Sequence, residues 1–193
     1  MKMESLNPKM PYKILNKFYF LAFLMLSFIS VVNSQVNSDS FKTDTLKPIK
    51  INLKHIEDHI HLYTDSQALV LDNLISEFAN SDSIEIKILT TDAEISTEGF
   101  DALTLDSARK QKIGAEFHQR GIMIGISPKL RYMRIQNTNP IMRILSNFET
   151  KYIVDNEFTP YFKSGDYYNG TFNGLMSLTN TLRINNKPKR NSR

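Results

Sequence analysis

The sequence contains no cysteine and no tryptophan. Without thiols, disulfides and thiol catalysis are both excluded, so stability has to come from a packed core. The sequence also lacks the Gly-x-Ser-x-Gly motif of serine hydrolases, the glycine-rich phosphate loop ending in Lys-Ser or Lys-Thr, and the His-Glu-x-x-His motif of zinc proteases. These absences remove the enzyme classes that are most readily defined by a short motif.

The excess of basic residues is confined to the two ends of the chain. The whole chain has 24 Lys and Arg against 20 Asp and Glu, whereas residues 35–182 have 15 against 19. A mildly acidic central region gives no electrostatic support to nucleic acid binding, so we expect no nucleic acid partner. The basic tail, residues 183–193, is predicted to be disordered and could contact anionic lipid.

Residues 1–34 have the three-part pattern of a secretory signal peptide. Lysines precede the apolar run 18–32, and small residues precede Gln35. The run of 15 residues is shorter than the roughly 20 needed to cross a bilayer, although an uncleaved anchor is the alternative. We therefore expect export to the periplasm or another extracytoplasmic space. Residues 35–50 are polar and are predicted to be a linker.

Residues 51–182 are predicted to form one α/β domain. Thr64 and Gln67 form a capping-box pattern that starts a helix running to about Asn80. Residues 121–127 are apolar on both faces, which is typical of a central strand. Two more strands, over 84–90 and 130–136, are expected beside it, with helices over 97–112 and 148–159. Helices interleaved with buried strands indicate a three-layer α/β/α sandwich with a small mixed sheet of three to four strands.

Residues 153–178 are predicted to contain the end of one helix, a short link and the start of the next. Pro160 lacks a backbone donor and is predicted to mark the boundary. Asp166 is the expected N-cap of the second helix. On that helix Gly170 and Gly174 share a face, where a neighbouring element can approach closely.

These motifs together resemble the TPM domain family of exported or lumenal α/β/α domains. Ile56-Glu-Asp58 and the capped helix start at Thr64 match the family's N-terminal motifs. The strongest match is Pro160, aromatic residues, a basic residue, Gly165-Asp166-Tyr and a further glycine. The resemblance covers about residues 51–182.

Some members of the TPM family are described as acid phosphatases or calcium-binding domains with acidic residues near the strand ends. The resemblance implies a divalent cation site, for Ca²⁺, Mg²⁺ or Zn²⁺, that includes Asp58. The sequence departs from the family pattern at two acidic positions, which here carry Met142 and Asn147. A neutral amide and a thioether are poor substitutes for carboxylates around such an ion.

Two functions follow from the resemblance and its departures. The first is a non-catalytic interaction or accessory domain of the cell envelope, with an envelope or membrane protein as partner. The alternative is a metal-dependent phosphatase with a partly eroded site, in which Asp58 and Asn147 hold the metal and Arg134 lies near the phosphate. Whether the chain is an enzyme is open at this point.

A separate candidate metal site comes from the residues alone. If the chain is extended there, the side chains of His55, Glu57, His59 and His61 point to one side of the strand. Imidazoles with a carboxylate are a plausible ligand set for zinc or copper. The competing interpretation is a solvated strand or loop.

Overall fold

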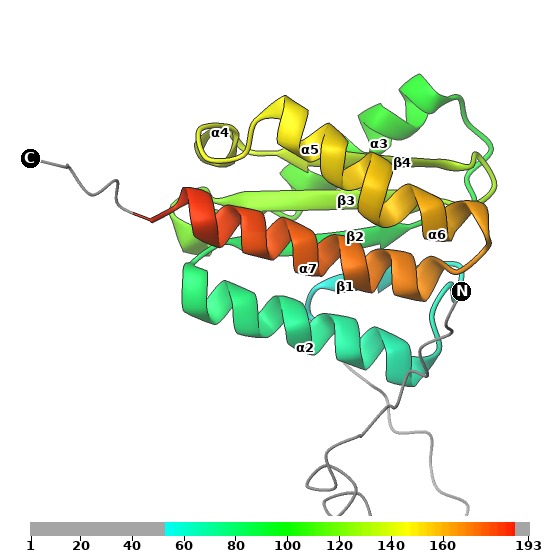
Figure 1. The fold of residues 1–193 in the computed structure, drawn as a ribbon. Helices are drawn as coiled ribbons and strands as arrows, with labels where there is room; N and C mark the ends of the chain where they lie inside the picture. The colour runs from blue at the N-terminus through cyan, green and yellow to red at the C-terminus, as the bar shows by residue number, and fades with distance from the viewer. Residues whose placement is uncertain (1–52, 188–193) are drawn as a thin grey trace, which may run out of the picture. The chain divides into compact units, whose positions relative to one another are not determined.

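The computed structural model describes residues 53–187, and within them four strands form one mixed sheet in the order β1-β2-β3-β4 (Figure 1). The first two pairings are parallel and the third is antiparallel. The strand bounds are β1 Ile56–Asp58, β2 Glu85–Thr90, β3 Gly121–Ser127 and β4 Tyr132–Asn137. The three predicted strands are confirmed as β2, β3 and β4, each with bounds within two residues of those expected. β1 is a fourth strand at one edge of the sheet, within the predicted number of three to four.

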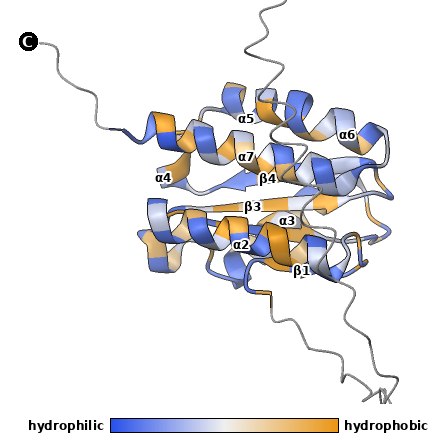
Figure 2. Ribbon diagram, turned by 60° about the horizontal axis from the view of Figure 1, so that its bottom comes forward, coloured by the Kyte–Doolittle hydropathy of each residue, from blue (hydrophilic) through white to orange (hydrophobic). Residues whose placement is uncertain are grey.

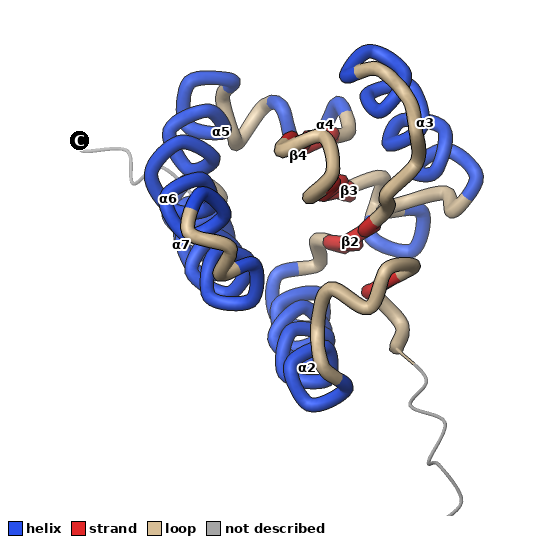
Figure 3. The backbone as a smooth tube through the Cα atoms, turned by 90° about the vertical axis from the view of Figure 1, so that its right-hand side faces the viewer, coloured by secondary structure: helices blue, strands red, loops and turns tan. Residues whose placement is uncertain are grey.

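Helices cover both faces of this sheet, so the predicted three-layer sandwich is confirmed (Figure 3). The main helices are α2 Asp65–Asp82, α3 Thr97–Lys110, α5 Asn147–Ile153, α6 Thr159–Lys163 and α7 Tyr167–Asn185. Shorter turns are the 3₁₀ turn Ala115–Phe117, α4 Asn139–Met142 and the π turn Val154–Phe158. In Figure 3, α3 lies on one side of the sheet, and α2, α7 and the α5–α6 segment lie on the other.

The main core lies between the sheet and the layer of α2 and α7. Hydrophobic colour runs along β3 in Figure 2, and every residue of this strand is buried. Ile122, Ile124 and Ile126 face this core, where Leu175 and Leu178 of α7 are also fully buried. A smaller cluster on the other face contains Met123, Leu89 and Ala108. Alternate side chains of β3 therefore supply both cores, as its unbroken apolar pattern predicts.

Gly125 sets how closely α3 approaches the sheet. A Cβ atom at this position would lie 2.9 Å from the Phe100 ring and would also overlap the hydroxyl of Thr104. Phe100 and Thr104 are both fully buried. The missing side chain in the middle of β3 thus allows α3 to lie directly on the strand.

The predicted helix boundary at Pro160 is wrong. α5, the π turn and α6 form one continuous helical segment, and the Thr159 N–H donates to the carbonyl of Val154, five residues earlier. Proline normally disrupts a helix because it lacks a donor and its ring meets the carbonyl four residues back. The extra residue of the π turn widens the helix just before Pro160 and accommodates the ring. The helix ends instead at Lys163, before Gly165, which has a φ of +82°.

The helix cap at Asp166 and the close approach at the two glycines are confirmed. Asp166 accepts a hydrogen bond from the Asn169 N–H at the start of α7. A Cβ atom at Gly170 would lie 2.7 Å from the Phe162 ring, and one at Gly174 would overlap the ring of Phe158. α7 therefore packs with its backbone against the aromatic side chains of the preceding helix.

Two other helix ends differ from expectation. α3 ends at Lys110 rather than at residue 112, because the chain turns at Gln111. α7 continues to Asn185, so Arg183 belongs to a helix rather than to the basic tail. The predicted signal peptide, the whole predicted linker and the end of the tail lie outside the described residues.

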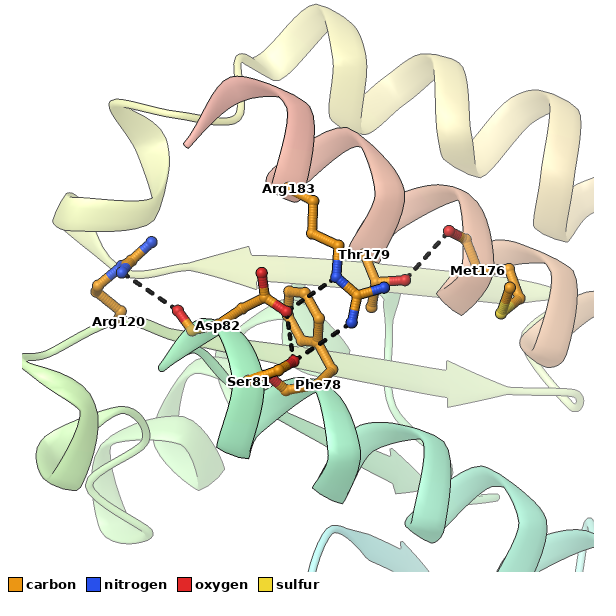
Figure 4. A network of polar contacts seen from close by, with 7 residues as sticks. All are labelled: Phe78, Ser81, Asp82, Arg120, Met176, Thr179 and Arg183. Atoms are coloured by element: carbon orange, nitrogen blue, oxygen red, sulfur yellow. Dashed lines mark hydrogen bonds and ion pairs between the residues drawn. The ribbon is translucent and has the colours of Figure 1, made fainter. Parts of the chain in front are cut away.

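Arg183 joins the C-terminal ends of α2 and α7 (Figure 4). Its Nε lies 2.9 Å from Asp82 Oδ2, and its guanidinium lies 5.2 Å from the centroid of the Phe78 ring. The Arg120 side chain donates to the Asp82 carbonyl from the start of β3. A negative Asp82 is unfavourable at a helix C-terminus, and the two arginines compensate for it. Among residues 53–187, no helix has both the length and the apolar character needed to cross a bilayer.

Candidate functional site

The carboxyl ends of β1, β2 and β3 lie side by side at one end of the sheet, which we call the carboxyl edge. Ligands commonly bind at this end of α/β folds. Parallel pairing places Asp58 beside Thr90, and Thr90 beside Ile126 at the end of β3. The turn between β3 and β4 and the link between α6 and α7 follow at the same edge (Figure 1). A ligand site is therefore expected at this edge.

Asp58 is held by hydrogen bonds from its own chain. One carboxylate oxygen accepts from the Leu62 N–H at 3.0 Å and from the Thr90 hydroxyl, and the other accepts from the Tyr63 N–H at 3.0 Å. The Tyr63 hydroxyl in turn lies 2.9 Å from the hydroxyl of Thr171 on α7. Asp58 thus fixes the turn that leads into α2, and each of its carboxylate oxygens already accepts at least one hydrogen bond.

Asn147, the second residue of the predicted metal site, lies at the opposite edge of the sheet. It is the first residue of α5, and Thr150 in the same turn accepts a hydrogen bond from the side chain of Asn137. Asn137 pairs with Ile122 near the start of β3, whereas Asp58 lies level with the end of β3. The antiparallel return of β4 carries the chain away from Asp58, so the fold does not bring the two residues together.

Arg134, the predicted phosphate ligand, lies on the face of the sheet that α3 covers. It pairs with Gly125 in the middle of the sheet, and its guanidinium lies 3.6 Å from the Asp101 carboxylate. Burial, and then the charge of Asp101, raise the pKa of the neighbouring Tyr132. Arg134 therefore has a partner on α3, away from both Asp58 and Asn147.

The residues of the histidine cluster separate because the strand is only three residues long. His55 is buried, and its backbone N–H donates to the buried Asp72 at 2.7 Å. Burial lowers the pKa of its imidazole, against the opposing effect of Asp72. Exposed His59 pairs with Glu57 at 3.9 Å, and His61 has turned to a φ of +51°.

In the part of the chain that the structure describes, no group of three or more His, Asp and Glu side chains is arranged to hold one metal ion. This covers all four members of the histidine cluster, together with Asp58. Metal binding by either predicted set stays an untested prediction.

A cavity of about 600 Å³ opens at the carboxyl edge, between the β3–β4 turn and the α6–α7 link. Arg131 and Lys163 supply its charges, and Thr159 supplies a hydroxyl. Part of its wall is apolar, formed by Met133, Val154 and Phe162. Sequence reasoning missed this site, although Lys163 lies inside the strongest of the family motifs.

The chemistry of the cavity is that of an anion-binding site. None of its lining residues in the described region is His, Asp or Glu, so no acidic side chain there opposes an anion. Within residues 53–187, neither Arg131 nor Lys163 has an ion pair within 4.0 Å. Two cations beside an apolar wall can bind an anionic group.

The fold and this edge site define an α/β sandwich domain with a cavity at the carboxyl ends of its parallel strands. The family model of the TPM domain matches residues 56–181, and the chain belongs to the TPM domain family. No curated protein matches the sequence.

Solved structures confirm the fold. The N-terminal domain of a protein from P. gingivalis has a TM-score of 0.60 at 20% identity, over 67% of this chain and 82% of that one. The BA42 protein from Bizionia argentinensis has a TM-score of 0.56 at 19% identity, over 63% and 82%. The N-terminal domain of cg2496 from Corynebacterium glutamicum has a TM-score of 0.52 at 12% identity, over 81% and 92%. Identities this low establish a shared fold and nothing about activity.

Proposed function

We propose that this TPM domain is a non-catalytic accessory domain of the cell envelope that acts by binding a partner. The observation that carries the proposal is the state of Asp58, whose two carboxylate oxygens are occupied by the Leu62, Tyr63 and Thr90 donors. Three of the roughly four lone-pair sites of this carboxylate accept hydrogen bonds, so a metal would compete with the contacts that hold the turn before α2. The separation of Asp58 from Asn147 and Arg134 supports the same conclusion.

Export is part of this proposal and rests on the signal-like residues 1–34. The partner is then an envelope or membrane protein, and the N-terminal segment or the basic tail provides contact with the membrane. Mass spectrometry of protein recovered from the envelope fraction tests this. A mature N-terminus at Gln35 is expected, whereas intact chain in the cytoplasm would contradict export.

The phosphatase alternative is tested by phosphate ester hydrolysis. We expect the full chain to hydrolyse p-nitrophenyl phosphate no faster than buffer, with Ca²⁺, Mg²⁺ or Zn²⁺ at millimolar concentration. The same ions should leave the melting temperature unchanged, since a ligand stabilises a protein only if it binds the folded state. Hydrolysis that Asp58→Ala abolishes and Lys129→Gln leaves intact would overturn the non-catalytic proposal.

A further inference from the structure

The cavity at the carboxyl edge presents its two cations from rigid turns. Arg131 has a φ of +50°, and its N–H donates to the Pro128 carbonyl at 3.0 Å, which closes the β3–β4 turn. Lys163 is the last residue of α6. The link after it is fixed by backbone bonds from Gly165 to the Phe162 carbonyl and from Asp166 to the Tyr161 carbonyl. Both side chains therefore leave the backbone at defined positions.

The charge around the cavity suits a single negative charge. Asp166 does not line the cavity, but it caps α7 between Gly165 and Tyr167, which do. Its carboxylate offsets part of the charge of Arg131 and Lys163, and it already accepts from the Asn169 N–H, one of the first amide groups of α7. A monoanionic carboxylate fits this balance better than a dianion, and arginine binds carboxylates in a fork geometry.

The rest of the wall requires an apolar body behind the charged group. Met133, Val154 and Phe162 lie on one side, and Phe162 is braced by the tilted Tyr167 ring at 4.9 Å between centroids. The volume of about 600 Å³ lies within the range of roughly 300–1,000 Å³ typical of small-ligand sites. Space, charge and apolar surface thus occur together at one place.

We propose that this cavity binds a carboxylate carried on an apolar body. Two sources supply this chemistry: the C-terminus of a peptide that ends in an apolar residue, and a free apolar acid. The inference rests on the proposed binding function and names the ligand class for it. Hydrolysis is not part of the step, because recognition needs only the two cations and the apolar wall.

Fluorescence anisotropy of the full chain with a dye-labelled peptide ending in two leucines tests the proposal. The peptide with a free C-terminal carboxylate should bind at least about tenfold more tightly than the same peptide ending in an amide, because the amide removes a charge-assisted hydrogen bond. Arg131→Gln combined with Lys163→Gln should lose this preference. Lys129→Gln is the matched control, since Lys129 lies in the same turn but pairs with Glu94.

Competition separates the two sources. Displacement of the peptide by N-acetyl-leucine supports recognition of any free apolar acid, and failure to displace it, with tight binding of the peptide, supports recognition of a chain end. Equal binding of carboxylate and amide peptides, unchanged preference in the double variant, or stronger displacement by inorganic phosphate would overturn the proposal. No binding of peptide or acid, without ester hydrolysis, overturns this inference alone and leaves the non-catalytic proposal standing.

Discussion

At the scale of single residues, His55 makes the stability of the domain depend on pH. Its side chain is 2% exposed, its Nδ1 has no hydrogen-bond partner in the described region, and burial lowers the pKa of its imidazole below 6.5. Below pH 6.5 the imidazole is protonated in the unfolded chain but stays neutral in the folded chain. The free energy of unfolding therefore falls with pH until the pH reaches the lowered folded pKa. Well above pH 6.5 the imidazole is neutral in both states, so this loss of stability is absent.

Urea unfolding between pH 8 and pH 5 measures this effect. We expect His55→Gln, which cannot titrate, to show a smaller loss of stability below pH 6.5 than the wild type. His59→Gln is the control, because the His59 side chain is 63% exposed. Identical pH dependence of the wild type and His55→Gln would contradict the assignment.

Tyr63 and Thr171 form a buried contact between residues 108 positions apart. Burial and the nearby Asp58 charge raise the pKa of Tyr63 far above 10, so its hydroxyl stays protonated. Tyr63→Phe leaves the Thr171 hydroxyl without its partner and should cost about 1–3 kcal/mol of stability. The cost of the double variant Tyr63→Phe with Thr171→Val should be smaller than the sum of the costs of the two single variants. Tyr152→Phe, at an exposed site, should have no effect. Additive costs in a urea double-mutant cycle would refute the coupling.

At the scale of elements, α7 depends on the absence of a side chain at Gly174. Gly174→Ala forces a methyl group into the ring of Phe158, which is fully buried, and should cost about 3 kcal/mol, the upper part of the range for overpacking. The methyl group of Gly165→Ala meets no atom within 4 Å, so the only cost is the strain of the left-handed backbone, about 1 kcal/mol. Chemical unfolding of the two variants gives the comparison, and equal costs would argue against the close packing.

Most elements could be predicted from the sequence because their signals are local. The capping box at Thr64, the cap at Asp166 and the apolar run of β3 each depend on a few adjacent residues, and all three are confirmed. Pro160 misled the prediction because its usual effect on a helix is cancelled by a π turn, whose extra residue has no sequence signature of its own.

The candidate site could not be predicted because it is formed by topology. Arg131 and Lys163 come from two different turns, and nothing in the spacing between them shows that they line the same cavity. The reverse holds for Asp58 and Asn147, which a family motif places in one site and the antiparallel β4 separates. Residue types were visible in the sequence, but their grouping required the order of the strands.

At the scale of the whole molecule, Arg183 links α7 to α2. Arg183→Met keeps the apolar stem but removes the contacts with Asp82 and Phe78, and should cost about 1 kcal/mol, less at high salt. Lys110→Met is the control, because it breaks an ion pair with Asp106 inside α3 and should leave stability unchanged. Urea unfolding at low and high salt measures both costs. If Lys110→Met lost as much stability as Arg183→Met, the long-range pair of Arg183 and Asp82 would have no special role.

α7 supplies Leu175, Leu178 and Leu182 to a core whose other residues come from the sheet and from α2, and α2 ends at Asp82, far earlier in the chain. During synthesis the ribosome releases the sheet and α2 first, and their apolar faces have no cover until α7 emerges. Native structure in this domain is therefore a late event in the life of the nascent chain. While α7 is still inside the ribosome, the apolar faces of α2 and the sheet stay exposed to aggregation and to chaperones.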